Sequence, residues 1–377
     1  MERVGLPALC ARRRLTRVAV ARWLWIGAAA LVAACAAEPA PRTARLPTGL
    51  DRPFPRLPAP SPAEAERVDL GRLLFFDRVL SGPADAACAD CHRPESALAD
   101  GEPTSRGVHG PLARNAPTLY NVAFKPRLFW DRRAPSLEVQ VFTPLFSPDE
   151  MAADPGELLA RLRAIPDYVS RFARAFPESA APIELANVAR ALAAFERTLV
   201  SRRSRYDRWA AGERDALTRQ ELRGLRLFRS LETRCFECHR PPTFDAPIAV
   251  GIGVPGDDAG VGGVTGNPAQ RGFFGVPTLR NVAATAPYMH DGSIATLEEV
   301  VDFYRRGGGR ALGVDPSRID GQIRAFDLRE DEAADLVAFL RALGDESTRP
   351  RAPESVPSGL PVPSPRLERL GEELPLR

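Results

Sequence analysis

The sequence predicts a mainly α-helical fold made of two related domains with long irregular loops. Apolar residues recur at helical spacing through much of the chain, whereas alternating strand patterns are almost absent. A Cys-x-x-Cys-His motif occurs twice, at residues 88–92 and 235–239, and the segment after the first motif returns after the second. Such self-similarity indicates a duplication. We therefore expect two small helical domains of the c-type cytochrome kind.

Cys-x-x-Cys-His is the attachment signature of a c-type haem, because two thiols bond to the haem vinyl groups and the adjacent imidazole binds the iron. A redox dithiol pair and half of a zinc site are the alternatives. A dithiol pair needs no His after its second Cys, and a zinc site needs further Cys or closely spaced His residues that this chain lacks. We expect two covalently bound haem c groups, held by Cys88, Cys91 and His92 and by Cys235, Cys238 and His239.

Length and charge limit the functional classes. The 377 residues leave room for two domains of ordinary size, each with a core of its own. The formal net charge of +3 is small and scattered, and no basic block lies beside aromatic residues. The composition therefore predicts no nucleic-acid partner.

The first 35 residues have the pattern of a targeting segment. Arginines over 12–17 precede a mostly apolar stretch over 18–34, and Val32 to Cys35 resembles a bacterial lipobox. Cleavage of an ordinary signal peptide near Ala36, or a retained anchor helix, are the alternatives. We expect a periplasmic protein on the inner face of the outer membrane, touching the membrane only through a lipid anchor on Cys35.

This leader also accounts for the cysteines. Cys10 and Cys35 belong to the leader and its cleavage site, and the other four are all used by the two haem motifs. No cysteine is left for a disulfide, although the expected compartment is oxidising.

Periodicity predicts helices in both halves of the chain. Residues 63–76 carry apolar side chains at helical spacing and lead into the first motif. Ser136 is expected to cap a short helix that runs through Gln140. Residues 156–174 and 182–210 are helical by periodicity and would link the two halves.

Composition sets the expected boundaries. Residues 36–62 are rich in proline, which predicts an extended tether, and residues 250–275 are expected to form a Gly-rich loop. We expect an N-terminal haem domain over 63–210 and a C-terminal haem domain over 211–345. Residues 346–377, with many prolines and glycines among charges, are expected to be a disordered tail.

The repeat suggests that the two irons differ. A single offset of 160 residues aligns Pro117 to Glu138 with the second half, and the same offset places Pro144 opposite Tyr304. Proline offers no donor, whereas a phenol can become an oxygen ligand of ferric iron. An open first iron could bind peroxide, while a closed second iron could only pass electrons. Met289 and His290 remain rival ligands of the second iron.

Three further residues are candidates for the chemistry at the first iron. Glu150 could take the first peroxide proton and return it to the leaving oxygen, although a carboxylate at a helix start is more often merely solvated. Gln140 could hydrogen-bond bound peroxide. Trp130, aligned with His290, could shorten an electron hop between the haems, or it could be ordinary core packing.

At these residues the chain resembles the bacterial di-haem cytochrome c peroxidase family, which includes MauG-like proteins. The likeness runs from about Val68 to Ala342. The stretches that carry it are LGRLLFFDRVLS, CADCH, RNAPTLYNVAF, FWDRRAPSLEVQ, PDEM, CFECH and VPTLRNVAATAPYMHDGSIATLEEVVDFY.

The resemblance implies a role for each candidate. His92 would be the proximal ligand of the peroxidatic haem and His239 that of the electron-transfer haem. Glu150 matches the catalytic acid and base, Gln140 matches a glutamine of the distal pocket, and Trp130 matches the tryptophan between the haems. A structural calcium ion is implied, with oxygen ligands from Asn115, Thr285 and Pro287.

Three positions depart from the peroxidase pattern of that family. The second iron is usually ligated by methionine, but the aligned residue here is Tyr304, as in the MauG-like branch. His109 is only an insecure match to the distal histidine that leaves the first haem on reduction. Thr233 replaces a surface tryptophan through which MauG oxidises its partner, so maturation of methylamine dehydrogenase is not implied.

The leading hypothesis is a di-haem peroxidase that reduces hydrogen peroxide with electrons from a small redox protein, a cytochrome c or a cupredoxin. The nearest alternative is a MauG-like oxidase that uses peroxide to modify Trp or Tyr in a protein substrate. A di-haem electron-transfer subunit without turnover is the alternative from another class. The sequence leaves open whether the chain forms a homodimer.

Overall fold

The computed structural model describes Phe54 and residues 61–363. The expected leader over 1–35, nearly all of the expected tether over 36–62 and the last fourteen residues lie outside this part. Within it, no helix combines the length and the apolar character needed to cross a bilayer. Its buried apolar residues form two separate cores, one in each half of the chain. We call these halves the N-terminal lobe and the C-terminal lobe.

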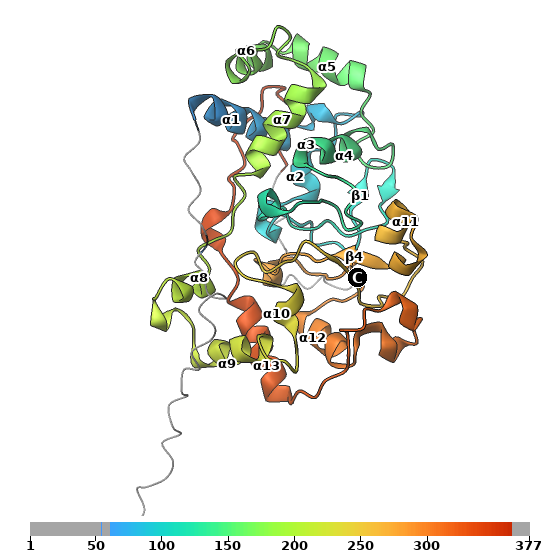
Figure 1. Cartoon of the computed structure of the whole chain (residues 1–377). Helices are drawn as coiled ribbons and strands as arrows, with labels where there is room; N and C mark the ends of the chain where they lie inside the picture. The colour runs from blue at the N-terminus through green and yellow to red at the C-terminus, as the bar shows by residue number, and fades with distance from the viewer. Residues whose placement is uncertain (1–53, 55–60, 364–377) are drawn as a thin grey trace, which may run out of the picture. The chain divides into compact units, whose positions relative to one another are not determined.

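The N-terminal lobe is organised on helix α1, Pro62–Phe76. Ser61 caps this helix by accepting a hydrogen bond from the backbone N–H of Glu64, and Pro62 suits its first position. The buried face of α1 packs against helix α7, Leu185–Glu196 (Figure 1). The other helices of this lobe are α2 (Cys88–Cys91), α3 (Leu137–Gln140), α4 (Phe142–Phe146), α5 (Pro155–Ala164) and α6 (Pro166–Ala175).

The C-terminal lobe repeats this plan with helix α9, Arg219–Phe228, packed against helix α13, Glu330–Arg341. Thr218 caps α9 in a capping box with Glu221. The remaining helices are α8 (Arg205–Ala210), α10 (Cys235–Cys238), α11 (Val261–Thr265) and α12 (Leu297–Arg305).

Strands are few and short in the described part. They form two antiparallel pairs, β1 (Arg106–Gly107) with β2 (Gly110–Pro111) and β3 (Ala249–Gly251) with β4 (Phe273–Gly275). Short 3-10 turns connect many elements, at Arg78–Leu80, Pro94–Ser96, Val122–Phe124, Arg214–Ala216, Pro268–Gln270, Val282–Ala284, Gly308–Leu312, Pro316–Arg318 and Glu346–Thr348. The expected mainly helical fold is confirmed, but the region 250–275 is more ordered than the Gly-rich loop we expected.

The duplication is visible in how each pair of long helices crosses. A Cβ added to Gly71 of α1 would lie 1.9 Å from the carbonyl oxygen of Ala191 in α7. A Cβ added to Gly224 of α9 would lie 1.9 Å from the carbonyl oxygen of Asp335 in α13. In both lobes, therefore, a glycine lets one helix lie directly on the backbone of the other.

The segment after each haem motif is also held in the same way. Asn121 and Asn281 both adopt a left-handed backbone conformation, which asparagine tolerates well. Their N–H groups donate to the carbonyl oxygens of Leu199, at 2.8 Å, and Leu343, at 3.2 Å. These matching contacts confirm two related domains.

Two expected long helices are in fact interrupted. The stretch 156–174 is divided between α5 and α6, because the ring of Pro166 removes a backbone donor and disfavours a helical Ile165. The stretch 182–210 is divided between α7 and α8, with an irregular segment between them. Tyr206 of α8 belongs to the core of the C-terminal lobe, so the expected boundary at residue 210 lies too late in the chain.

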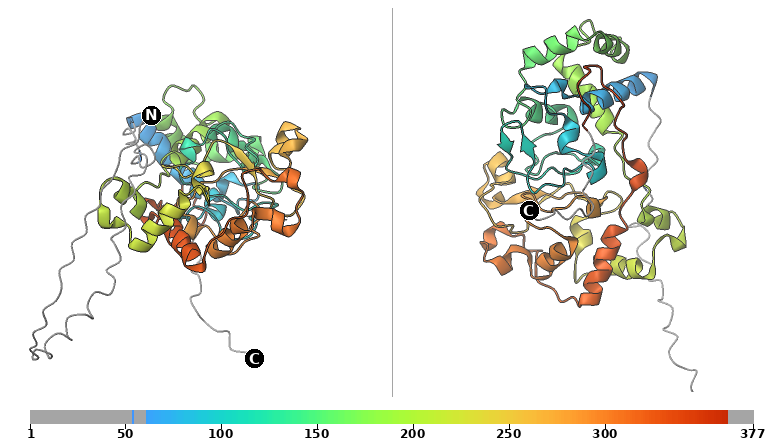
Figure 2. Two further views of the ribbon diagram at one scale, coloured as in Figure 1. Left: turned by 60° about the horizontal axis from the view of Figure 1, so that its bottom comes forward. Right: turned by 180° about the vertical axis from the view of Figure 1, so that it is seen from behind.

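The expected disordered tail is wrong for residues 346–363. Val356 is buried in the core of the N-terminal lobe, and Leu360 packs against the same core. The hydroxyl of Ser358 donates to the buried carboxylate of Asp77 at 2.6 Å, and Tyr168 donates to the same carboxylate at 2.6 Å. Figure 2 shows this segment, coloured dark red in the right-hand view, running beside α1. We call residues 350–363 the C-terminal strap.

The helix crossing gives a direct test. The substitution Gly71→Ala should lower the free energy of unfolding by about 1–3 kcal/mol or more, because its methyl group would overlap the backbone of α7. Chemical denaturation of the protein with its haems attached measures this change. Gly321→Ala is the matched control, since nothing lies within 4 Å of an added Cβ there. Equal stability of the two variants would contradict the close helix crossing.

Candidate active site

The first haem motif begins on the short helix α2 and ends at His92. The imidazole Nδ1 donates to the carbonyl oxygen of Leu98 at 3.0 Å, and Leu98 turns this carbonyl toward the ring through a left-handed conformation. Burial lowers the pKa of His92, which favours the neutral ring. The Nε2 atom of His92 is then available as a metal ligand, as in proteins whose ligating histidines are oriented by a carbonyl.

The second motif has the same local structure. It begins on helix α10, and Nδ1 of His239 donates to the carbonyl oxygen of Phe244 at 3.1 Å. Phe244, like its counterpart Leu98, has a left-handed backbone conformation. Burial lowers the pKa of His239 as well. Both imidazoles are therefore prepared to bind a metal through Nε2.

The four thiols are not prepared for redox exchange. Burial raises the pKa of Cys91 to about 12 and that of Cys235 to about 11, and it also raises the pKa of Cys88 and Cys238. Reactive dithiol pairs instead have a lowered pKa. Raised thiol pKa values weigh against a dithiol oxidoreductase.

One continuous cavity joins the two motifs. Its volume is about 1520 Å³, which exceeds the roughly 300–1,000 Å³ typical of a site for one small ligand. Both histidines and all four motif cysteines line it. The donor set, the orientation of the imidazoles and the volume fit two haem groups. All the expected site residues line the same cavity, namely Asn115, Trp130, Gln140, Glu150, Thr285, Pro287 and Tyr304.

Glu150 lies in the N-terminal lobe, in the turn after α4. Its N–H donates to the carbonyl of Ser147 at 3.2 Å, and its own carbonyl accepts from Val108, next to strand β1, at 3.0 Å. Burial raises the pKa of the Glu150 carboxyl, an effect that the nearby Arg133 opposes. The field of Glu150 in turn contributes to the raised pKa of Cys91, which places this carboxyl close to the first motif.

A glycine supports the backbone at Glu150. A Cβ added to Gly107 of β1 would lie 1.7 Å from the carbonyl oxygen of Asp149 and 3.0 Å from the Cα of Glu150. The β1–β2 hairpin can approach the Glu150 turn this closely only without a side chain at residue 107. Gly107 is a supporting residue that the sequence analysis missed.

Gln140 and Pro144 line the same cavity as Glu150. Ser136 caps α3 by accepting from the N–H of Val139, as expected, and this helix ends at Gln140. Pro144 lies on α4, which follows directly, and both residues line the cavity. A carboxyl, an amide and a proline without a donor thus belong to the cavity lining that the N-terminal lobe supplies.

Tyr304 lies at the corresponding place in the C-terminal lobe. Thr296 caps α12 in a capping box with Glu299, and Tyr304 is near the end of this helix. Burial raises the pKa of Tyr304, and so do the nearby thiols of Cys238 and Cys235. The phenol is therefore close to the second motif.

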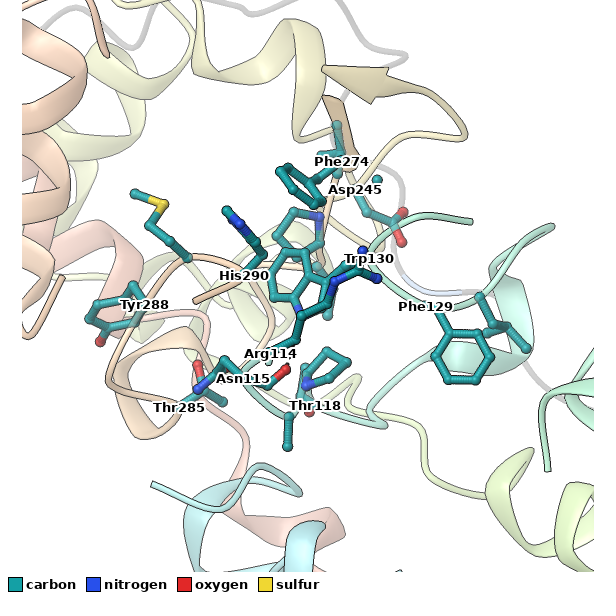
Figure 3. Close-up of a pocket in the computed structure, with 18 of the residues that line it drawn as sticks. Arg114, Asn115, Thr118, Phe129, Trp130, Asp245, Phe274, Thr285, Tyr288 and His290 are labelled. Carbon is teal, nitrogen blue, oxygen red and sulfur yellow. Dashed lines mark hydrogen bonds between the residues drawn. The ribbon is translucent and has the colours of Figure 1, made fainter. Parts of the chain in front are cut away.

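The rival ligand His290 is engaged elsewhere. Its ring is stacked on Phe274 with the centroids 3.8 Å apart, and its Nε2 is 3.9 Å from a carboxylate oxygen of Asp258. Figure 3 shows the two rings together beside Trp130. Met289, the other rival, also lines the cavity.

Trp130 lies where the two lobes meet. Its indole N–H donates to the carbonyl oxygen of Asn115 at 2.9 Å, and its own carbonyl accepts from Gly275 of the C-terminal lobe at 2.7 Å. The N–H of Asn115 donates to the carbonyl oxygen of His290 at 2.8 Å. Trp130 is thus held by backbone contacts at the junction between the lobes (Figure 3).

Ion pairs that the sequence did not reveal close this junction. Arg114 binds Asp258 of the C-terminal lobe through two bonds of 2.7 and 2.9 Å, and it binds Asp131 at 2.6 Å. Lys125 lies 3.6 Å from Asp245, another residue of the C-terminal lobe. Of these residues, only Asp131 could be singled out from the sequence, because the offset of 160 residues aligns it with Asp291.

His109 is not part of this cavity. It lies exposed in the turn between β1 and β2 and does not line the cavity. No group of three or more His, Cys, Asp or Glu side chains in the described part could hold a metal ion. A calcium ion at Asn115, Thr285 and Pro287 would instead use an amide and backbone carbonyls, and it stays a prediction.

The fold and the cavity define a c-type cytochrome with two haem sites in related lobes. Comparisons with known proteins agree with this class. A family model described as "Di-haem cytochrome c peroxidase" matches residues 65–215. The chain is 38% identical over 296 residues to the methylamine utilization protein MauG of Methylorubrum extorquens, covering 77% of this chain and 81% of that protein.

Two further relatives connect the chain to peroxidases and to a solved structure. It is 33% identical over 322 residues to the cytochrome c551 peroxidase of Nitrosomonas europaea, covering 83% of this chain and 90% of that protein. It also resembles the crystal structure of a MauG-like protein associated with microbial copper homeostasis. The TM-score is 0.71 at 38% identity, covering 81% of this chain and 96% of the other.

The chain belongs to the di-haem cytochrome c peroxidase and MauG family. Membership implies two haem c groups, for which the two motifs supply fitting residues. The protein is a peroxidase-like oxidoreductase.

Proposed function

We propose that this protein reduces hydrogen peroxide at the haem bound by His92. Electrons would arrive through the haem bound by His239 from a small redox protein, a cytochrome c or a cupredoxin. The observation that carries the proposal is the difference between Pro144 and Tyr304, which line the cavity at corresponding positions of the two lobes. One lobe offers a side chain that cannot bind iron, and the other offers a phenol that can.

Glu150 would handle the protons at the N-terminal haem. The bound haem supplies an iron for the peroxide oxygen and electrons for cleavage of the O–O bond. Glu150 would accept the proton of the nearer oxygen and return it to the farther one, which leaves as water. Burial raises the pKa of this carboxyl and so makes it a better base than an exposed glutamate. The amide of Gln140 would hold the peroxide by a hydrogen bond.

Trp130 would serve as the bridge for electrons between the two haems. Its backbone and indole N–H are anchored at the lobe junction, so the ring keeps a constant position between the two halves of the cavity. A fixed and readily oxidised indole at this point would divide one long electron transfer into two short ones.

A second candidate function follows from Tyr304. In this alternative the protein uses peroxide to oxidise Trp or Tyr of a partner protein, as a MauG-like oxidase. A tyrosinate ligand favours ferric iron and so favours reaction without prior reduction. The third hypothesis, an electron-transfer subunit without turnover, finds no support in a family whose relatives are named peroxidases.

We also propose a periplasmic location with a lipid anchor at Cys35. Covalent haem attachment takes place outside the cytoplasm, and members of this family are periplasmic cytochromes. The mass of the mature N-terminus distinguishes an acylated Cys35 from simple cleavage near Ala36.

We propose that a structural calcium ion lies at the lobe junction. The amide nitrogen of Asn115 donates to the carbonyl of Glu102 at 2.8 Å, and Asn115 lies beside Thr285 (Figure 3). Carbonyl and amide oxygens are the ligands that calcium prefers. The backbone carbonyls of Thr285 and Pro287 would complete the protein's share of the site.

The role of Glu150 predicts that Glu150→Gln slows peroxide consumption by roughly 10²–10⁴-fold, because the amide cannot accept the proton. Steady-state turnover with a reduced cytochrome c measures the effect, and the optical spectrum checks that both haems remain. Gly107→Ala keeps the carboxyl but displaces its backbone, and it should also slow turnover. Gly321→Ala is again the control. Unchanged turnover in Glu150→Gln would remove this residue from the mechanism.

The second candidate function predicts a different response of the fully ferric protein. A MauG-like oxidase should react rapidly with peroxide in this state, and the spectra of both haems should change together. A classical peroxidase, in which a histidine such as His109 must first leave the iron, should react only after one-electron reduction. Stopped-flow spectra of the ferric and half-reduced forms separate the two, and a protein inert in both states would contradict both functions.

Calcium removal should loosen the lobe junction. At a calcium concentration of about 100 times the dissociation constant, the ion would contribute about 2.7 kcal/mol to stability. Dialysis against a calcium chelator should therefore lower the melting temperature and peroxide turnover, and added Ca²⁺ should restore both. Asn115→Ala should show the low melting temperature with or without Ca²⁺. A chelated protein with an unchanged melting temperature and no bound calcium would refute the site.

A further inference from the structure

A buried carboxyl in the N-terminal lobe has no role in the function proposed above. Glu196 is the last residue of α7, and only 6% of its surface is exposed. Its Oε2 atom is buried and makes no hydrogen bond with any described residue. An unsatisfied buried polar atom destabilises a fold, so it is rarely kept without a reason. Glu196 also lines the haem cavity.

The duplication shows that the fold itself does not need this carboxyl. The Cβ of Phe195 is 3.0 Å from the ideal Cβ position at Gly71, and that of Phe339 is 2.8 Å from the position at Gly224. The two phenylalanines are therefore equivalent, and the residue after each is Glu196 in one lobe and Leu340 in the other. Leu340 is buried and lines the cavity too. An apolar side chain thus satisfies the packing at this position.

The charged groups around Glu196 are largely engaged with one another. Arg197, next along the helix, is paired with Glu138 of α3 at 2.7 Å. On α1, which packs against α7, Asp69 and Arg72 are paired at 3.1 Å. From α2, Cys88 faces Glu196 and becomes a neutral thioether once haem is attached. Burial, only partly opposed by Arg197, raises the pKa of Glu196 to about 8.

We propose that Glu196 takes up a proton when the haem bound at the first motif is reduced and releases it when that haem is oxidised. One electron arrives from the reduced C-terminal haem or from a small reductant, and one proton arrives from water. Reduction removes a positive charge from the iron, and a negative carboxylate nearby then becomes more costly in the dry cavity. This inference rests on a haem at the first motif and not on the reduction of peroxide.

The consequence is a difference in pH response between the two haems. The reduction potential of the N-terminal haem should fall as the pH rises through the range in which Glu196 ionises. The C-terminal haem, with Leu340 at the same position, lacks this group. Alkaline pH should therefore shift a single added electron toward the C-terminal haem.

The test is a redox titration of the holoprotein and of Glu196→Gln, followed optically between about pH 6 and about pH 9, a range that brackets the pKa near 8. In the native protein the N-terminal potential should fall with pH, approaching about 59 mV per unit for one proton per electron. In Glu196→Gln this pH dependence should be lost or strongly reduced. The potential of the C-terminal haem is the internal control and should be the same in both proteins.

A second variant and a second measurement keep the test decisive. Glu196→Leu copies the C-terminal lobe and should also remove the pH dependence. A raised pKa stabilises the native state fully below about pH 4.5, and this contribution is lost as the pH rises through about 8. Both variants should therefore lose less stability than the native protein over this range. A carboxyl with a purely structural role would change the pH dependence of stability but not that of the reduction potential. If the potential of the N-terminal haem changes with pH equally in the native protein and in both variants, the proposal is overturned.

Discussion

A helix that rests directly on the backbone of another is the contact on which both lobes depend. At Gly71 and Gly224 an added methyl group would overlap a carbonyl oxygen of the facing helix. This crossing places the helix that leads to each haem motif against the helix that closes each core. The motif then presents a histidine whose Nδ1 is already bound to a backbone carbonyl. Each imidazole is therefore oriented by a backbone carbonyl of its own lobe.

On this common frame, a few substitutions make the two haem sites unlike. Pro144 and Tyr304 differ in their ability to ligate iron, and Glu196 and Leu340 differ in their ability to hold a proton. Glu150 adds a carboxyl to the part of the cavity lining that the N-terminal lobe supplies. A duplication gives two equal sites, and the division of labour between them depends on such differences. The lobe junction, with Trp130 and its backbone contacts, then lies between two haem sites that differ in their side chains.

Local patterns in the sequence were sufficient for the motifs and the duplication, because these depend on spacing and on aligned positions, whereas Asn115, Thr285 and Pro287 came only from the family resemblance. Contacts between distant segments were not predictable. The residues around Arg114 in the sequence do not predict its ion pair with Asp258. The need for glycine at residue 107 follows only from its close contact with the backbone of the Glu150 turn. The break at Pro166 could have been predicted from the proline alone. The strap was missed because its composition resembles that of disordered segments.

The C-terminal strap places the last described residues of the chain on the core that begins with the first helix. Val356 fills that core and Ser358 binds Asp77, beside the helix that leads to the first haem motif. A segment near the end of the described residues therefore completes a lobe whose other core residues all lie before residue 200. Without residues 350–363, the core of the N-terminal lobe would lack Val356, and the carboxylate of Asp77 would lack the hydroxyl of Ser358.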